Sequence, residues 1–143
     1  MAIYSLSQRI TVGTIGVAAW DARAAASHKP KIMEVGLSMN AATASVYGLG
    51  RPAAAGTQTT PVVWLDEADG EAPAGVISSA VAFSGAPTVP TQFLRRVSTP
   101  ATIGAGIIWT FPRGLGLPES GNIVLWNITA AAATSDVWGV SDQ

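Results

Sequence analysis

Short hydrophobic runs, rich in β-branched and aromatic residues, alternate along this chain with glycine, proline, serine and aspartate. Most prolines fall between the runs, where a missing backbone N–H costs little. This pattern predicts an all-β fold: a two-sheet antiparallel β-sandwich of jelly-roll type, with residues 1–143 in one domain. The expected strands are Ile3–Leu6, Arg9–Ile15, Lys31–Met39, Ala44–Gly50, Pro61–Leu65, Val76–Phe83, Gln92–Val97, Gly106–Phe111, Asn122–Ile128 and Asp136–Val140.

Two segments depart from the strand pattern. Val17–Ser27 is rich in alanine, the best helix former, and is expected to form a helical turn or two. Ala130–Thr134 consists of small residues and is expected to be a loop between the last two strands.

The clearest alternation of the chain lies in Lys31–Met39. Side chains of neighbouring strand residues point to opposite faces, so Met33, Val35, Leu37 and Met39 should share one face and Ile32, Glu34, Gly36 and Ser38 the other. The face that carries Met33, Val35, Leu37 and Met39 is expected to be the buried one.

Four expected strands carry an aliphatic residue directly before a tryptophan: Val63-Trp64, Ile108-Trp109, Leu125-Trp126 and Val137-Trp138. Each such strand presents a large apolar group to both of its faces. One face belongs to the core of the sandwich, and the other would be wet in a solitary domain. We therefore expect the outer faces to be covered.

Charged residues make up only 12% of the chain, about half of the ~25% usual in soluble domains. No uninterrupted apolar run is long enough for a transmembrane helix, so we expect no membrane partner. The net charge of −1 argues against nucleic acid as a partner. A surface this poor in charge favours a homo-oligomer, or a subunit covered by other subunits of a larger shell.

The residues that could carry chemistry are few. There is no cysteine, and His28 is the single histidine, with Asp21 or Asp136 as the acids that could orient it. No serine lies in a nucleophile motif, so we expect no catalytic residue, no enzymatic activity, no cofactor and no transition metal. The glycine pairs at 104–106 and 114–116 read as a bend and a turn, not phosphate loops.

The acidic run Asp66-Glu67-Ala68-Asp69-Gly70-Glu71 is the best candidate for a cation site. Clustered carboxylates on a glycine-containing loop suit calcium, although the spacing does not fit an EF-hand. A solvated loop between strands is the alternative, and weak calcium binding at Asp66, Asp69 and Glu71 stays open.

Adjacent arginines occur in the run Phe93-Leu94-Arg95-Arg96-Val97. Alternation would send one of them toward the core, where an unpaired charge is very costly. Either this strand is a sheet edge, or one arginine pairs with a carboxylate such as Glu34 or one on a neighbouring subunit. We predict Arg95, Arg96 and Arg113 as inter-subunit contacts, because the planar guanidinium pairs bidentately with carboxylates.

The chain resembles small β-sandwich virion proteins of tailed bacteriophages, of the head-decoration or cement type. The resemblance covers the whole length and rests on the start Met1-Ala2-Ile3-Tyr4-Ser5-Leu6, on Ala/Gly/Thr-rich strands, and on stretches such as 93–97 and 106–114. The start carries no secretory signal pattern. The resemblance implies a jelly roll present in many copies in a virion assembled in the host cytoplasm, bound to copies of itself and to a major capsid protein.

A second function stays open from the sequence. A receptor- or carbohydrate-binding β-sandwich module of a phage tail or fibre would need exposed aromatic platforms. Trp20, Tyr47 and Trp64 are the candidates for such platforms.

Overall fold

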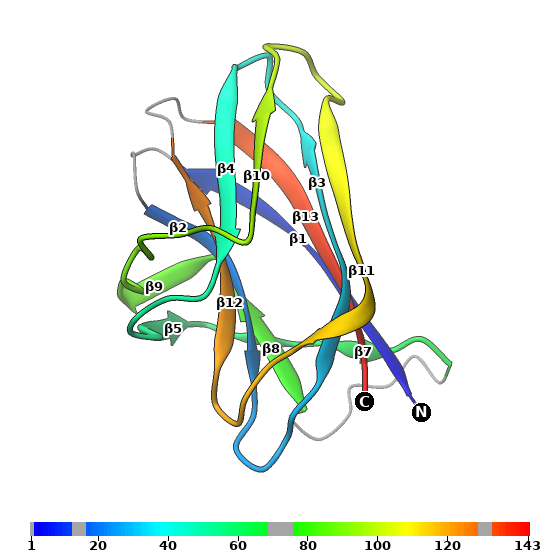
Figure 1. Cartoon of the computed structure of the whole chain (residues 1–143). Coiled ribbons are helices and arrows are strands. Elements are labelled where there is room, and N and C mark those ends of the chain that lie inside the picture. Colours follow the sequence, from blue (N-terminus) through cyan, green and yellow to red (C-terminus); the bar gives the residue numbers. More distant parts are fainter. Residues whose placement is uncertain (1, 13–16, 69–75, 129–132) are drawn as a thin grey trace.

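The computed structural model describes residues 2–12, 17–68, 76–128 and 133–143, and they form a β-sandwich without a helix in the described part of the chain. Two antiparallel sheets face each other, one on each side of the view in Figure 1. The five-stranded sheet has the order β11-β3-β13-β1-β7 and the six-stranded sheet the order β10-β4-β12-β2-β8-β6, while β5 and β9 form a separate pair. The strands are β1 Ile3–Val12, β2 Val17–Ala24, β3 Lys31–Met39, β4 Ser45–Gly50, β5 Thr57–Thr59, β6 Val62–Val63, β7 Leu65–Asp66, β8 Ile77–Ala80, β9 Ala82–Gly85, β10 Arg95–Thr99, β11 Gly106–Gly116, β12 Asn122–Asn127 and β13 Ala133–Asp142.

The connectivity is that of a jelly roll, as predicted. The first four strands run in order across the two sheets and the last four return beside them, so that β1 pairs with β13, β2 with β12, β3 with β11 and β4 with β10. Each pair is antiparallel, and successive pairs alternate between the two sheets. Eight strands wound in this way are the defining feature of the jelly roll.

Residues 51–94, between β4 and β10, add the five short strands β5 to β9. The pair β5–β9 lies outside the six-stranded sheet, while β6 and β7 extend one sheet each. The chain crosses from one sheet to the other at Trp64, which is fully buried and donates its indole N–H to the Ser79 hydroxyl at 2.7 Å. A Cβ atom at Gly139 would overlap the Trp64 ring, so this crossing requires glycine there. Trp64 thus closes the side of the sandwich opposite β10 and β11.

The expected helical turns at 17–27 are wrong, because Val17–Ala24 is the strand β2. β2 pairs with β12 on one side and with β8 on the other, and the alanines that suggested a helix give it small side chains for two crowded faces. Tertiary pairing outweighs the helix propensity of alanine, which amounts to only a few tenths of a kcal/mol per residue.

Other expected boundaries shift. The two runs expected at 3–6 and 9–15 form the single strand β1, with residues 13–15 outside the described residues. The run expected at 76–83 divides into β8 and β9, which belong to different sheets. In the loop expected at 130–134, Thr134 belongs to β13, and residues 130–132 lie outside the described residues.

The face prediction for β3 is correct for Val35, Leu37 and Met39, which are all buried in the core. It is wrong at Met33, which is only partly buried, whereas Ile32 is fully buried. The pairing of β3 with β13 places Glu34 opposite Val140 but Ile32 opposite Ser141, so Met33 is an extra residue. This β-bulge reverses the alternation from Met33 toward the start of the strand.

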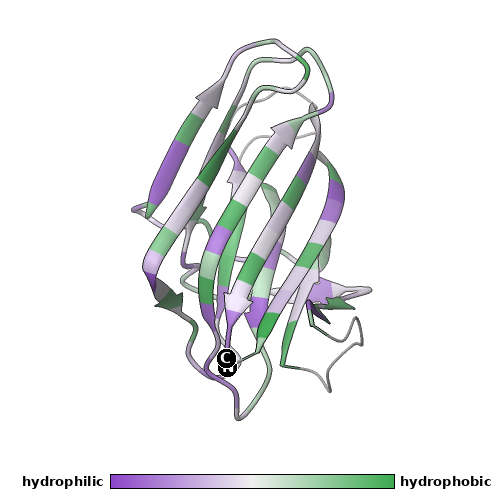
Figure 2. Cartoon of the chain, turned by 90° about the vertical axis from the view of Figure 1, so that its right-hand side faces the viewer, coloured by the Kyte–Doolittle hydropathy of each residue, from purple (hydrophilic) through white to green (hydrophobic). Residues whose placement is uncertain are grey.

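Three of the four aliphatic–tryptophan pairs lie within strands and present apolar groups to both faces of their sheet, whereas Trp64 lies at the crossing between β6 and β7. Trp64 and Trp109 belong to the main core, whereas Trp126 lies in a separate cluster on the outer face of the six-stranded sheet. Val137 is in the core and its neighbour Trp138 lies on the outer face of the five-stranded sheet. Figure 2 shows the alternation of hydrophobic and more hydrophilic residues along the strands of that sheet.

Candidate functional site

The residues that could carry catalysis are scattered. His28 lies in the turn between β2 and β3, where its Nδ1 is 3.2 Å from the carbonyl oxygen of Ala26. Neither acid considered for it contacts it: Asp21 is bonded to Arg23, and Asp136 to Arg9. No group of three or more histidine, aspartate or glutamate side chains suited to a metal occurs among the described residues.

The acidic run begins at the outer edge of the five-stranded sheet. Asp66 ends β7 and accepts the backbone N–H of Ala68 at 2.8 Å. Asp69 and Glu71 lie outside the described residues, so calcium binding there stays a prediction.

The three aromatic residues expected as binding platforms are not platforms. Trp20, Tyr47 and Trp64 are fully buried between the sheets, where the Trp20 and Trp64 rings lie 6.2 Å apart. The Tyr47 hydroxyl is 3.4 Å from the Ser135 hydroxyl, and burial raises the pKa of Tyr47. These side chains build the core because both sheets present large inward residues at this level.

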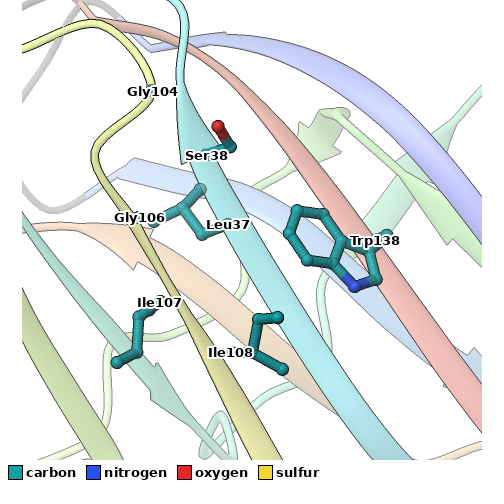
Figure 3. A pocket seen from close by; sticks show the side chains of 7 residues that line it. All are labelled: Leu37, Ser38, Gly104, Gly106, Ile107, Ile108 and Trp138. Atoms are coloured by element: carbon teal, nitrogen blue, oxygen red, sulfur yellow. The ribbon is translucent and has the colours of Figure 1, made fainter.

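The outer face of the five-stranded sheet carries a shallow apolar hollow, which we call the tryptophan hollow. The Trp138 indole extends from β13 over β3 and Ile108 comes from β11 (Figure 3), and the hollow is lined by Leu37, Ser38, Gly104, Gly106, Ile107, Ile108 and Trp138. A Cβ atom at Gly36 would overlap the Trp138 ring, so glycine at this position lets the indole lie on the sheet. The indole N–H donates to the Glu34 carboxylate at 3.0 Å, and Ile108 is 55% exposed.

A second hollow, the arginine hollow, lies at the open edges of the two sheets. It is lined by Arg95, Thr110, Phe111, Pro112, Arg113 and Gly114. The Arg95 guanidinium is 5.4 Å from the centre of the Phe111 ring, which joins an edge strand of each sheet by a cation–π contact. Arg95 and Arg113 are both exposed. Two of the three predicted contact residues therefore line one surface.

Arg96 lies outside this hollow, with its guanidinium 5.7 Å from the centre of the Phe93 ring. β10 is an edge strand, which was the first of the two alternatives for the paired arginines. The intramolecular pairing with Glu34 is wrong, because Glu34 accepts the Trp138 N–H and lies on the outer face of β3. An edge strand leaves both arginine side chains in water, so neither needs a buried partner.

A local irregularity in β11 shapes the arginine hollow. The pairing of β11 with β3 breaks between Thr110 and Leu115. Gly114 has φ of 70°, a left-handed conformation that favours glycine, and Pro112 has no N–H to donate to a ladder. The chain therefore bulges between these points, and Arg113 stands out from the edge.

Sequence reasoning missed a buried polar network beneath the β5–β9 pair. The Asp21 side chain is fully buried and accepts hydrogen bonds from Gln58 Nε2 at 2.7 Å, Asn122 Nδ2 at 3.1 Å and the backbone N–H of Ala80 at 3.1 Å. Arg23 adds an ion pair to Asp21 at 3.3 Å and donates to the Ala55 carbonyl oxygen at 2.6 Å. Burial raises the pKa of Asp21, and these donors partly oppose the rise.

This network holds residues 55–58 against the outer face of the six-stranded sheet, and it gives the buried Asp21 carboxylate four hydrogen-bond donors. A buried carboxylate with several hydrogen-bonding partners stabilises a structure only while all of these partners are present. We therefore assign the Asp21 network to the fold, which leaves the two hollows as the candidate functional surfaces.

No family model matches the sequence, and a search of curated proteins finds no match. No helix in the described part of the chain is long and apolar enough to span a membrane. The function must therefore be inferred from the surfaces of this chain.

Proposed function

We propose that this chain is a non-enzymatic structural protein of a virion, a capsid decoration or cement subunit that stabilises the shell by contacts with copies of itself and with a major capsid protein. The observation that carries the proposal is the tryptophan hollow, an apolar surface on a jelly-roll sheet that the described chain leaves uncovered. Uncovered apolar patches mark protein–protein contact sites.

The chemistry of the five-stranded face fits a protein partner. Its centre consists of small or apolar side chains: Gly36 lies between Ile108 and Trp138, and Gly106 and Ser38 form the neighbouring pair. The nearest charges are already engaged, because Glu34 accepts the Trp138 N–H and Arg9 pairs with Asp136 at 2.9 Å. Specific protein–protein interfaces have an apolar centre surrounded by a polar rim, and the outer face of the five-stranded sheet has the same arrangement.

The jelly roll adds general support, since the fold recurs in viral capsid proteins and also in lectins. A fold alone does not assign a function. The bare surfaces of this chain, and not its fold, therefore support the proposed function.

Co-sedimentation with particles that lack the subunit tests the proposal. Wild-type protein should bind in a fixed number of copies per particle, and Ile108→Asp should reduce binding by about tenfold or more, because it places a charge in a desolvated contact. Thr59→Asp is the matched control, since Thr59 is exposed on β5 at the opposite face and should not affect binding. Wild-type protein that stays in the supernatant would refute the proposal.

One observation favours the second function, a receptor- or carbohydrate-binding module of a phage tail or fibre. Trp138 lies flat and partly exposed beside a hydrogen-bonding carboxylate, Glu34, as in a site where a sugar ring stacks on an indole. Trp138→Ala separates the two functions. Loss of glycan or cell binding with normal particle incorporation would favour the binding module, and loss of incorporation without any glycan binding would favour the shell subunit.

A further inference from the structure

The ion pairs of the fold leave charges of opposite sign on opposite edges of the sandwich. Three ion pairs occur among the described residues: Arg9–Asp136, Arg23–Asp21 and Lys29–Glu119. The cationic side chains without an ion pair to a described residue are Lys31, Arg51, Arg95, Arg96 and Arg113.

These cations gather on one side of the molecule. Arg95 and Arg96 begin β10, and Arg113 stands out from β11, the edge strands on this side. Arg51 donates to the carbonyl oxygen of Gly116 at the end of β11, and Lys31 lies opposite Gly116 in the ladder. The arginine hollow is therefore the centre of a basic edge.

The opposite edge of the same sheet is acidic. β7 is the last strand on that side, and it carries Asp66, followed directly by the exposed Glu67. Leu65, on the same short strand, is 45% exposed and places an apolar side chain beside the two carboxylates. The other acids without an ion pair among the described residues, Glu34 and Asp142, lie on the inner strands β3 and β13.

We propose that copies of this chain dock head to tail, with the Asp66–Glu67 edge of one copy in the arginine hollow of the next. This rests on the proposed role as an assembling subunit and names the contact through which the copies meet. Carboxylates match the arginine fork, and exposed Leu65 matches the apolar ring of Phe111. Because the two surfaces differ, the contact is heterologous and closes a ring if the rotation between copies permits.

The shape of the basic edge determines how a neighbour binds. Pro112 and the bulge at Gly114 interrupt the ladder of β11, and such features prevent strand addition at sheet edges. Side chains, not backbone pairing, must therefore make the contact. A contact of this kind weakens as salt screens the charges.

Charge exchange between the two edges tests this contact. Arg95→Glu with Arg113→Glu makes both edges acidic, and Glu67→Lys weakens the acidic edge; each variant alone should lose self-association by about tenfold or more in sedimentation velocity. An equimolar mixture of the two variants should associate more strongly than either alone, because the intact arginine hollow of the Glu67→Lys variant then meets the intact acidic edge of the arginine variant. Lys29→Glu, a charge reversal at the turn between β2 and β3, is the control and should associate like wild type. All the substituted side chains are exposed, so melting temperatures should stay near that of wild type.

Several results would overturn the head-to-tail contact. The first is a mixture of the two variants that associates no better than either variant alone. The second is a wild-type chain that stays monomeric at all concentrations. The third is a Glu67→Lys variant that behaves as wild type while the arginine variant fails to bind particles. The third result would mean that the arginine hollow binds carboxylates of the major capsid protein instead. Binding of a DNA duplex that the arginine variant abolishes would assign it to phosphates. A chain that binds its particle without self-association keeps the proposed function and loses only this contact.

Discussion

The two outer faces of the sandwich each carry a tryptophan, and the chain treats them differently. On the six-stranded sheet, Trp126 is fully buried and makes a T-shaped contact with the Phe93 ring, with 5.8 Å between the ring centres, and Phe83 packs on the same cluster. Both phenylalanines come from residues 51–94, the segment inserted between β4 and β10. On the five-stranded sheet, Trp138 and Ile108 have no such cover in the described chain. The chain thus covers one apolar face itself and leaves the other available to a partner.

The largest expected effect sharpens this contrast. Trp126→Ala should lower the free energy of unfolding by about 3–5 kcal/mol, because it empties a packed site. Trp138→Ala, on the bare face, should cost less than about 1.5 kcal/mol, since the ring is partly exposed and lies outside the core clusters. Urea unfolding measures both. Equal costs would mean that the two faces are packed alike.

The second effect concerns the polar network that fixes the inserted segment. Asp21→Ala should cost about 3 kcal/mol or more, because it leaves Arg23, Gln58 and Asn122 without their common acceptor beneath the segment. Asp136→Ala, which removes an exposed ion pair on the bare face, should cost less than about 1 kcal/mol. If Asp21→Ala is as mild as Asp136→Ala, the network does not hold the cover in place.

Much of the fold could be predicted from the sequence, because the alternation of apolar and polar residues and the positions of glycine and proline are local signals. Val35, Leu37 and Met39 follow them, and the aliphatic–tryptophan pairs of β11, β12 and β13 place apolar groups on both faces of their sheets. The bulge at Met33 could not be predicted, since it depends on the partner strand β13. The strand at 17–24 was missed because its pairing with β12 and β8 outweighs its alanine content.

The candidate surfaces were predictable only in part. The low charge and the adjacent arginines pointed to contact residues, and Arg95 and Arg113 do line one hollow. That Trp138 and not Trp20 or Trp64 lies outside depends on strand phase, which the sequence around each tryptophan does not determine. The Asp21 network joins residues up to 101 positions apart, a separation that no local pattern reports.

The third effect is the pH dependence of stability, which differs in sign between the two faces. Burial raises the pKa of Asp21 above its unfolded value, so the folded state holds the proton more tightly. The stability from this group is complete below the unfolded pKa of about 3.9 and is lost as pH rises through the folded pKa. The hydrogen bond from Arg9 lowers the pKa of Asp136, so the stability from that group is present above about pH 3.9 and lost as pH falls through its folded pKa.

Chemical denaturation at a series of pH values from about 2 to about 7 separates the two groups. Asp21→Asn should remove a fall in stability on the alkaline side of the unfolded pKa. Asp136→Asn should remove a fall on the acidic side. A variant profile parallel to that of wild type would contradict the assignment for that residue.

The smallest expected effect on stability is at Ile108, the most exposed side chain of the tryptophan hollow. Ile108→Ser should change the free energy of unfolding by no more than about 0.5 kcal/mol, because 55% of the side chain is exposed before the substitution. Urea unfolding of the isolated protein measures this change. The same variant should lose particle binding, since the side chain is buried only when a partner covers the face. A residue that is neutral in the free subunit and costly in the assembly belongs to an interface. A loss of more than about 2 kcal/mol in the isolated protein would instead make Ile108 part of the chain's own packing, and the contrast between the two faces would fail.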